Sequence, residues 1–306
     1  ALDMMDEGTA SRSALQIAEE LAGLGATMGL GADLDSGFVS LSALKDKLDP
    51  ALAVFGDVVL NPSFPADELE RLRRRRLAQI QQEGAQPIGI ALRVLPGLLY
   101  GADHAYGQPL TGSGTTDSVG RITRDTLVKF HADWFKPSNA TMVVVGDTTM
   151  AEIKPRLEQH FGAWKPGTVP AKNLRTVAVP AKQTIYVIDR PGAEQSLVFA
   201  GHVAPPKANP DEIAIEAMNA ILGGQFTSRI NMNLREDKHW SYGARASLAD
   251  ARGQRPWLLS APVQTDKTVE SMREILREVN EYVGARPATT EEVTKIRNRD
   301  VRALSG

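Results

Sequence analysis

Arg235 and Tyr242 are the side chains whose types and spacing could bind a ligand, and both lie in NLREDKHWSYG, residues 233–243. An arginine offers a planar fork of N–H donors to a carboxylate or a peptide carbonyl. A tyrosine hydroxyl can donate a hydrogen bond to an oxygen on which negative charge develops. Two interpretations therefore stand at this point: the pair binds a substrate, or it has the structural role that such residues usually have.

The rest of the sequence offers no second arrangement of catalytic residues. There is no cysteine, so a thiol nucleophile, a thiolate zinc site and a disulfide are all excluded. The histidines are scattered, and none has a histidine or glutamate partner at a spacing typical of zinc sites. They are His104, His131, His160, His202 and His239. No serine occupies a G-x-S-x-G turn, so the residues by themselves predict neither a nucleophile nor a metal site.

Two motif-like stretches are better explained by local structure. The segment GLGATMGLGA, residues 23–32, follows a helical pattern, so Gly23 or Gly25 is expected to end that helix and no nucleotide site is predicted. The arginine-rich run at 71–76 follows acidic residues, and apolar residues at helical spacing in the same segment are expected to form a buried face. The run is interpreted as a solvated helix face in preference to a polyanion site.

Composition narrows the classes of partner. The chain has 306 residues, 42% of them hydrophobic, and a net charge of −2. This charge would not hold a nucleic acid or an anionic bilayer, and no apolar stretch is long enough to span a membrane. We expect a soluble protein with neither partner, and its compartment, cytoplasmic or periplasmic, stays open. The first and last residues suggest that both ends of the sequence are truncated.

Helical and strand-like patterns alternate along the chain. Helices are expected from Asn209 to Gly223, after Pro50, from Ser63 and after Asp147. Strands are expected at residues 38–44, 141–147, 184–189, 196–201 and 257–263. Residues 165–182 have no period and indicate a linker.

An internal repeat accompanies this mixed α and β pattern. GTASR at 8–12 falls opposite QFTSR at 225–229, and LSAL at 41–44 falls opposite LSAP at 259–262. The helical segments that follow keep their apolar positions in phase, so two copies of one fold are predicted.

Several ordered segments resemble the M16 zinc peptidases, the family of pitrilysin, insulinase and mitochondrial processing peptidase. These segments are DEGTASRS, LNPSFPADELERLR, HAYG, VVVGD, PGAEQS, ILGGQFTSRI and LREDKHWSYGA. The resemblance implies an α+β fold of two homologous α/β-roll domains of the LuxS/MPP-like metallopeptidase type, each a mostly antiparallel sheet backed by helices. It places an N-terminal-type domain at 1–170, a linker at 171–182 and a C-terminal-type domain at 183–306.

The family's zinc motif is H-x-x-E-H with a later helical glutamate, and the resemblance aligns other residues with it. Asp3 stands where the second histidine belongs, Leu2 where the general base belongs, and Ala78 in the region of the third ligand. The resemblance therefore implies that this chain holds no zinc of its own and that zinc belongs to a catalytic partner half. It also implies that Arg235 and Tyr242 bind the peptide substrate, as the pair does in inactive halves. The family's small residues before the tyrosine are here bulkier, His239, Trp240 and Ser241.

These implications lead to one expected function and one alternative. The expected function is the inactive, substrate-binding half of an M16 metalloendopeptidase, without activity alone, which pairs with a separate or fused catalytic half around a peptide. The alternative is a scaffold subunit of a larger complex without peptidase activity.

Overall fold

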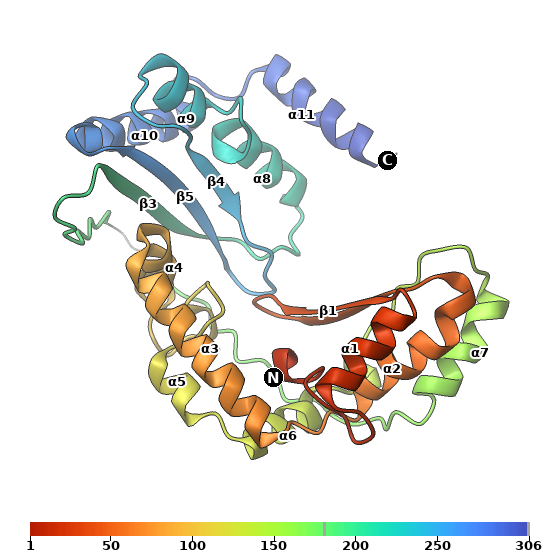
Figure 1. Cartoon of the computed structure of the whole chain (residues 1–306). Coiled ribbons are helices and arrows are strands. Elements are labelled where there is room, and N and C mark those ends of the chain that lie inside the picture. The colour runs from red at the N-terminus through yellow and green to blue at the C-terminus, as the bar shows by residue number, and fades with distance from the viewer. Residues whose placement is uncertain (180–181, 305–306) are drawn as a thin grey trace. The chain divides into compact units, whose positions relative to one another are not determined.

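The computed structural model describes residues 1–179 and 182–304. The chain divides into two compact units, Ala1–Gln82 with Gly112–Asn173, and Glu83–Thr111 with Leu174–Gly306 (Figure 1). The second unit therefore takes in a segment from the first half of the sequence. The predicted boundaries of the two homologous domains stay a prediction, and residues 180–181 of the predicted linker lie outside the described residues.

The first unit packs helices against an antiparallel hairpin of β1 (Thr27–Ala32) and β2 (Gly37–Ser42). Its helices are α1 (Ala14–Gly23), α2 (Leu48–Leu60), all but the last turn of α3 (Ala66–Ala85), α5 (Thr116–Arg121), α6 (Arg124–Trp134) and α7 (Met150–Phe161). Its core includes the fully buried Met5, Val58 and Phe64. Four of these helices begin at a Ser or Thr capping box, which satisfies backbone N–H groups that a helix leaves free at its start.

The second unit is built on a three-stranded antiparallel sheet with the order β3-β5-β4. The strands are β3 (Gln195–Ala204), β4 (Arg245–Leu248) and β5 (Arg255–Gln264). The helices are α4 (Pro87–Tyr100), α8 (Glu212–Asn219), α9 (Arg229–Asn231), α10 (Thr268–Val283) and α11 (Thr290–Ala303). Two π-helical turns, η5 (Ala220–Gly224) and η6 (Met232–Asp237), flank α9.

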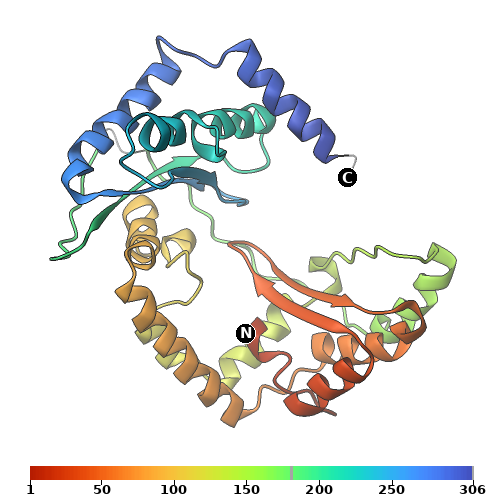
Figure 2. The ribbon, with the colours of Figure 1, turned by 45° about the horizontal axis from the view of Figure 1, so that its top comes forward.

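Strand alternation divides the two faces of this sheet between different helices. Leu259, which pairs with Ala200 and Ala246, is fully buried and belongs to the cluster that includes Ile275 of α10. On the opposite face, Gly201 of β3 meets α4, and a Cβ added there would lie 2.6 Å from Leu95 Cδ2. The helices α8 and α9 lie on one side of the strands and α4 on the other (Figure 2).

The four predicted helices are confirmed as α2, α3, α7 and α8, and the predicted strands at 38–44, 196–201 and 257–263 as β2, β3 and β5. The predicted strands at 141–147 and 184–189 were wrong, because neither pairs with a strand among the described residues. Their apolar side chains stand in solvent, with Val145 92% and Val187 86% exposed. Gly25 does end the α1 segment in a left-handed conformation, but the strand β1 directly after it was not predicted.

Among the described residues, no helix combines the length and the apolar character that a membrane span requires.

Candidate functional site

Arg235 lies in the π-helical turn η6, which continues directly from α9. The wider turn is closed by a hydrogen bond from Lys238 N to Asn233 O, five residues earlier, at 3.0 Å. Leu234 beside it is fully buried in the sheet core, whereas the Arg235 side chain is 30% exposed. The turn is thus fixed by a core residue and directs its arginine to the surface.

The loop from Lys238 to Gly243 returns from η6 to the sheet and carries Tyr242. His239 adopts a left-handed backbone (φ 57°), and its Nδ1 lies 3.0 Å from Arg235 O, so this nitrogen donates to that carbonyl. Trp240 packs against the core, and Ser241 Oγ donates to Pro262 O of β5 at 2.6 Å. The bulky residues before the tyrosine are therefore turned inward or tied down, and Tyr242 is left 82% exposed.

The structure brings Arg235 and Tyr242 together and adds a second aromatic ring. The Cζ atom of Arg235 lies over the Tyr242 ring at 4.9 Å from its centroid, and over the Phe226 ring at 4.6 Å. The Nε atom pairs with Glu236 Oε1 at 3.1 Å. Among the described residues nothing else bonds to this guanidinium, so its two Nη groups are free to donate to a ligand. Phe226 was missed from the sequence, although it lies in the repeated segment QFTSR.

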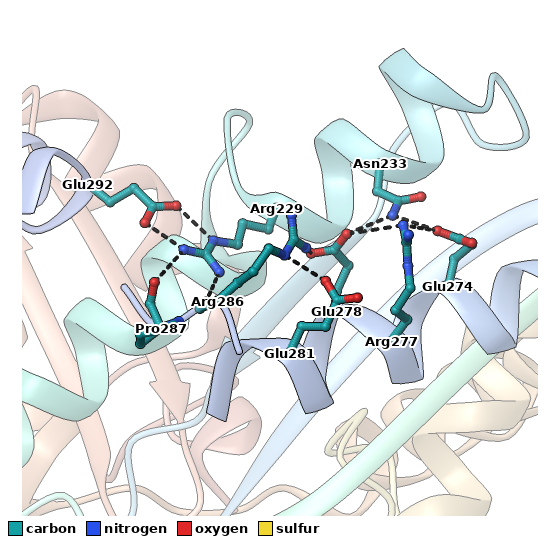
Figure 3. A network of polar contacts seen from close by, with 9 residues as sticks. All are labelled: Arg229, Asn233, Glu274, Arg277, Glu278, Glu281, Arg286, Pro287 and Glu292. Carbon is teal, nitrogen blue, oxygen red and sulfur yellow. Dashed lines mark hydrogen bonds and ion pairs between the residues drawn. The ribbon is translucent and has the colours of Figure 1, made fainter. Parts of the chain in front are cut away.

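A network of ion pairs and hydrogen bonds supports the segment that carries Arg235 (Figure 3). Asn233 of η6 donates to Glu278 Oε1 at 2.7 Å and to Glu274 Oε2 at 2.8 Å, both on α10. Arg229 of α9 donates to both carboxylate oxygens of Glu292 on α11, at 2.8 and 2.7 Å. These contacts join α9 and η6 to two helices of the same unit.

The positions aligned with the zinc motif lie in the first unit and do not form a metal site. Leu2 packs its side chain against the core and beside Gly37. Asp3 forms an ion pair with Arg76, so its carboxylate already has a cationic partner. Ala78 is exposed on α3. An aliphatic, a carboxylate neutralised by arginine and a methyl group do not fit a zinc ion, and no group of three or more metal-ligating side chains occurs within residues 1–179 and 182–304.

Comparison with known proteins identifies the family of this chain. The protein-family model described as "Peptidase M16 inactive domain" matches residues 121–299 of the sequence. A second family model, described as "Insulinase (Peptidase family M16)", matches residues 3–101. The chain belongs to the M16 peptidase family. The resemblance drawn from the sequence motifs is thereby confirmed.

Three relatives of this M16 chain indicate the range of the family. An uncharacterised zinc protease of Mycobacterium leprae is 24% identical over 283 residues, which cover 90% of this chain and 62% of that protein. Subunit 1 of the human mitochondrial cytochrome b-c1 complex is 24% identical over 224 residues, which cover 71% of this chain and 45% of that protein. The crystal structure of a peptidase M16 inactive domain from Pseudomonas fluorescens aligns with a TM-score of 0.91 and 28% identity, covering 100% of this chain and 73% of that one.

The M16 chain spans less than two thirds of the length of these curated relatives. The α+β fold with small antiparallel sheets is shown by the similar structure. The substrate-binding roles of Arg235 and Tyr242 stay a prediction, and so does the assignment of zinc to a partner half.

Proposed function

We propose that this chain is the non-catalytic, substrate-binding half of an M16 zinc metalloendopeptidase. A catalytic half, separate or fused, carries H-x-x-E-H and its zinc, and the two enclose an unstructured peptide. One observation carries the proposal: an arginine and a tyrosine meet on the surface with donors that no described residue uses, while the positions of the zinc motif hold Leu2, Asp3 and Ala78.

Arg235 and Tyr242 carry hydrogen-bond donors that can bind a peptide backbone. The Nη groups of Arg235, which bond to no described residue, can donate to peptide carbonyl oxygens, and the exposed hydroxyl of Tyr242 can donate to the oxygen on which charge develops during attack on the peptide bond. Because Glu236 already pairs with Nε, the guanidinium is partly neutralised and a neutral carbonyl is a suitable partner for its open end. In this proposal the chain supplies no nucleophile and no base.

Reconstitution tests the proposal. The purified chain is mixed with the catalytic subunit that co-purifies with it, or assayed as the fused protein, and hydrolysis of a fluorogenic unstructured peptide is followed. Arg235→Ala and Tyr242→Phe are each expected to lower kcat/KM about 10- to 1000-fold, the range for loss of one oxyanion donor. Tyr186→Phe and Arg273→Ala remove the same groups from exposed sites elsewhere and should leave hydrolysis unchanged.

Two results would contradict the proposal. Full hydrolysis by both site variants would show that Arg235 and Tyr242 do not bind the substrate. Stoichiometric zinc in the purified chain, together with hydrolysis by the chain alone, would show that it has a catalytic centre of its own.

A second candidate function is a scaffold subunit without peptidase activity. It is favoured by the similarity to subunit 1 of the human cytochrome b-c1 complex, whose name describes a part of a larger assembly. Purification of the tagged chain from its native source decides between the two. A stable complex that contains no H-x-x-E-H protein would support the scaffold, whereas a stoichiometric H-x-x-E-H partner would support the peptidase.

A further inference from the structure

The geometry points to Phe226 as a positioning residue that holds the Arg235 guanidinium in a fixed orientation for peptide binding. The inference rests on the proposed function for the use of Arg235, but the orientation itself can be measured without a substrate. Phe226 has no role in the zinc motif or in the Arg235–Tyr242 pair as predicted from the sequence.

Phe226 is a large apolar side chain that the fold does not bury. It is 60% exposed, and its ring lies beneath the Arg235 guanidinium, 4.6 Å from Cζ. The Tyr242 ring lies against the same group at 4.9 Å. Two exposed rings therefore lie close to one cation, and each adds a cation–π attraction that depends on the position of the guanidinium over the ring.

A buried amide fixes the distance between the two segments that carry these rings. Asn231 of α9 is 3% exposed. Its Nδ2 donates to Phe226 O at 2.6 Å, and its Oδ1 accepts from Ala244 N, two residues after Tyr242, at 2.9 Å. The turn at Phe226 and the loop at Tyr242 are thus tied to one side chain that cannot move without losing hydrogen bonds in the interior.

The consequence is an arginine with one open end. The guanidinium lies over the rings of Phe226 and Tyr242, its Nε atom pairs with Glu236, and its Nη groups remain free among the described residues. A long side chain of this kind loses rotamer freedom when it binds a ligand. Since Phe226 restricts that freedom beforehand, the arginine can bind a peptide carbonyl at a smaller entropic cost.

The experiment compares Phe226→Leu, which keeps apolar volume, with Phe226→Tyr, which keeps the aromatic face. Side-chain nitrogen relaxation of Arg235 Nε in the purified chain reports its order. We expect Phe226→Leu to lower that order and Phe226→Tyr to preserve it. Phe38→Leu, another exposed phenylalanine, should have no effect. Unchanged thermal unfolding in all variants shows that the fold is intact.

A double-mutant cycle in the reconstituted peptidase then links order to binding. Phe226→Leu should raise KM for the fluorogenic peptide about two- to fivefold when Arg235 is present, the range expected for one exposed cation–π contact, and should have no effect in the Arg235→Ala background. Unchanged Nε order in Phe226→Leu, or an equal effect in both backgrounds, would overturn the positioning role. Lowered Nε order with full activity of Arg235→Ala would instead confirm the positioning and refute the proposed function.

Discussion

Replacement of Glu292 by glutamine tests whether the ion network beside Arg235 stabilises the second unit. Hydrogen bonds from the Arg229 guanidinium, joined by the backbone N–H of Thr289, lower the pKa of Glu292 from 4.5 to about 2. A shift of this size corresponds to at most about 3 kcal/mol of stabilisation by the ionised carboxylate. Because the Glu292 side chain is 30% exposed, solvent screening reduces this, and we expect Glu292→Gln to lose about 1–2 kcal/mol at pH 7.

The pH dependence of this loss has a defined sign. The pKa of Glu292 in the folded chain lies below its value of 4.5 in the unfolded chain. The carboxylate therefore stabilises the fold fully above about pH 4.5, and this contribution disappears as the pH falls toward 2. The difference between wild type and Glu292→Gln should accordingly shrink on acidification.

Urea unfolding, followed by tryptophan fluorescence at about pH 7 and about pH 3, measures both effects. Glu291→Gln is a matched control, because Glu291 lies in the same first turn of α11, is exposed and loses the same charge. The control should change the free energy of unfolding by less than about 0.5 kcal/mol. Hydrogen exchange should also show earlier opening of α11 in Glu292→Gln. Equal losses in both variants, or a loss independent of pH, would refute the role assigned to Arg229.

The remaining predictions concern the core and a partly buried histidine. Burial lowers the pKa of His131, whose Nε2 donates to Val59 O at 2.8 Å, so its stabilising contribution is complete above pH 6.5 and is lost as the pH falls through its lower folded pKa. Thermal unfolding between about pH 7.5 and 5 should therefore depend less on pH in His131→Gln. Leu259→Ala, at a fully buried sheet position, should lower the free energy of unfolding by about 2–5 kcal/mol in urea titrations, and a loss below about 1 kcal/mol would contradict the core assignment. Asn231→Asp cannot donate to Phe226 O and buries a charge, so it should cost at least about 2 kcal/mol in the same assay.

Local signals in the sequence account for the elements that were predicted correctly. The helix after Asn209 was found because an acidic first turn and apolar residues at helical spacing lie within one segment. Its predicted ends were wrong: α8 begins at Glu212 after Asp211, which makes no side-chain cap, and Gly223 lies inside the π-helical turn η5. The strands at 141–147 and 184–189 were overpredicted because an apolar run shows that a segment can pair, while pairing depends on a neighbour elsewhere in the chain. Helical spacing does not guarantee burial, because Ile213 of α8 is apolar and yet 85% exposed.

The candidate site also contains residues that the sequence indicated and residues that it did not. The seven-residue separation of Arg235 and Tyr242, read with the family resemblance, was enough to select both residues. Nothing local to the sequence indicated that Phe226 contacts the same guanidinium or that η6 is a π-helical turn, because both depend on tertiary packing. The pairing of Asp3 with Arg76, far along the chain, was likewise invisible at the level of motifs.

The exposure of the site allows function to be separated from folding. Tyr242 is 82% exposed and its hydroxyl bonds to no other described residue, so Tyr242→Phe should leave the free energy of unfolding within about 0.5 kcal/mol of wild type. The phenylalanine ring also preserves the contact with the Arg235 guanidinium. A fall in hydrolysis by this variant would therefore report the loss of one hydrogen-bond donor to the substrate. If the variant instead unfolds at clearly lower urea concentration, the hydroxyl has a structural partner. A fall in the activity of the variant would then not show that the hydroxyl binds the substrate.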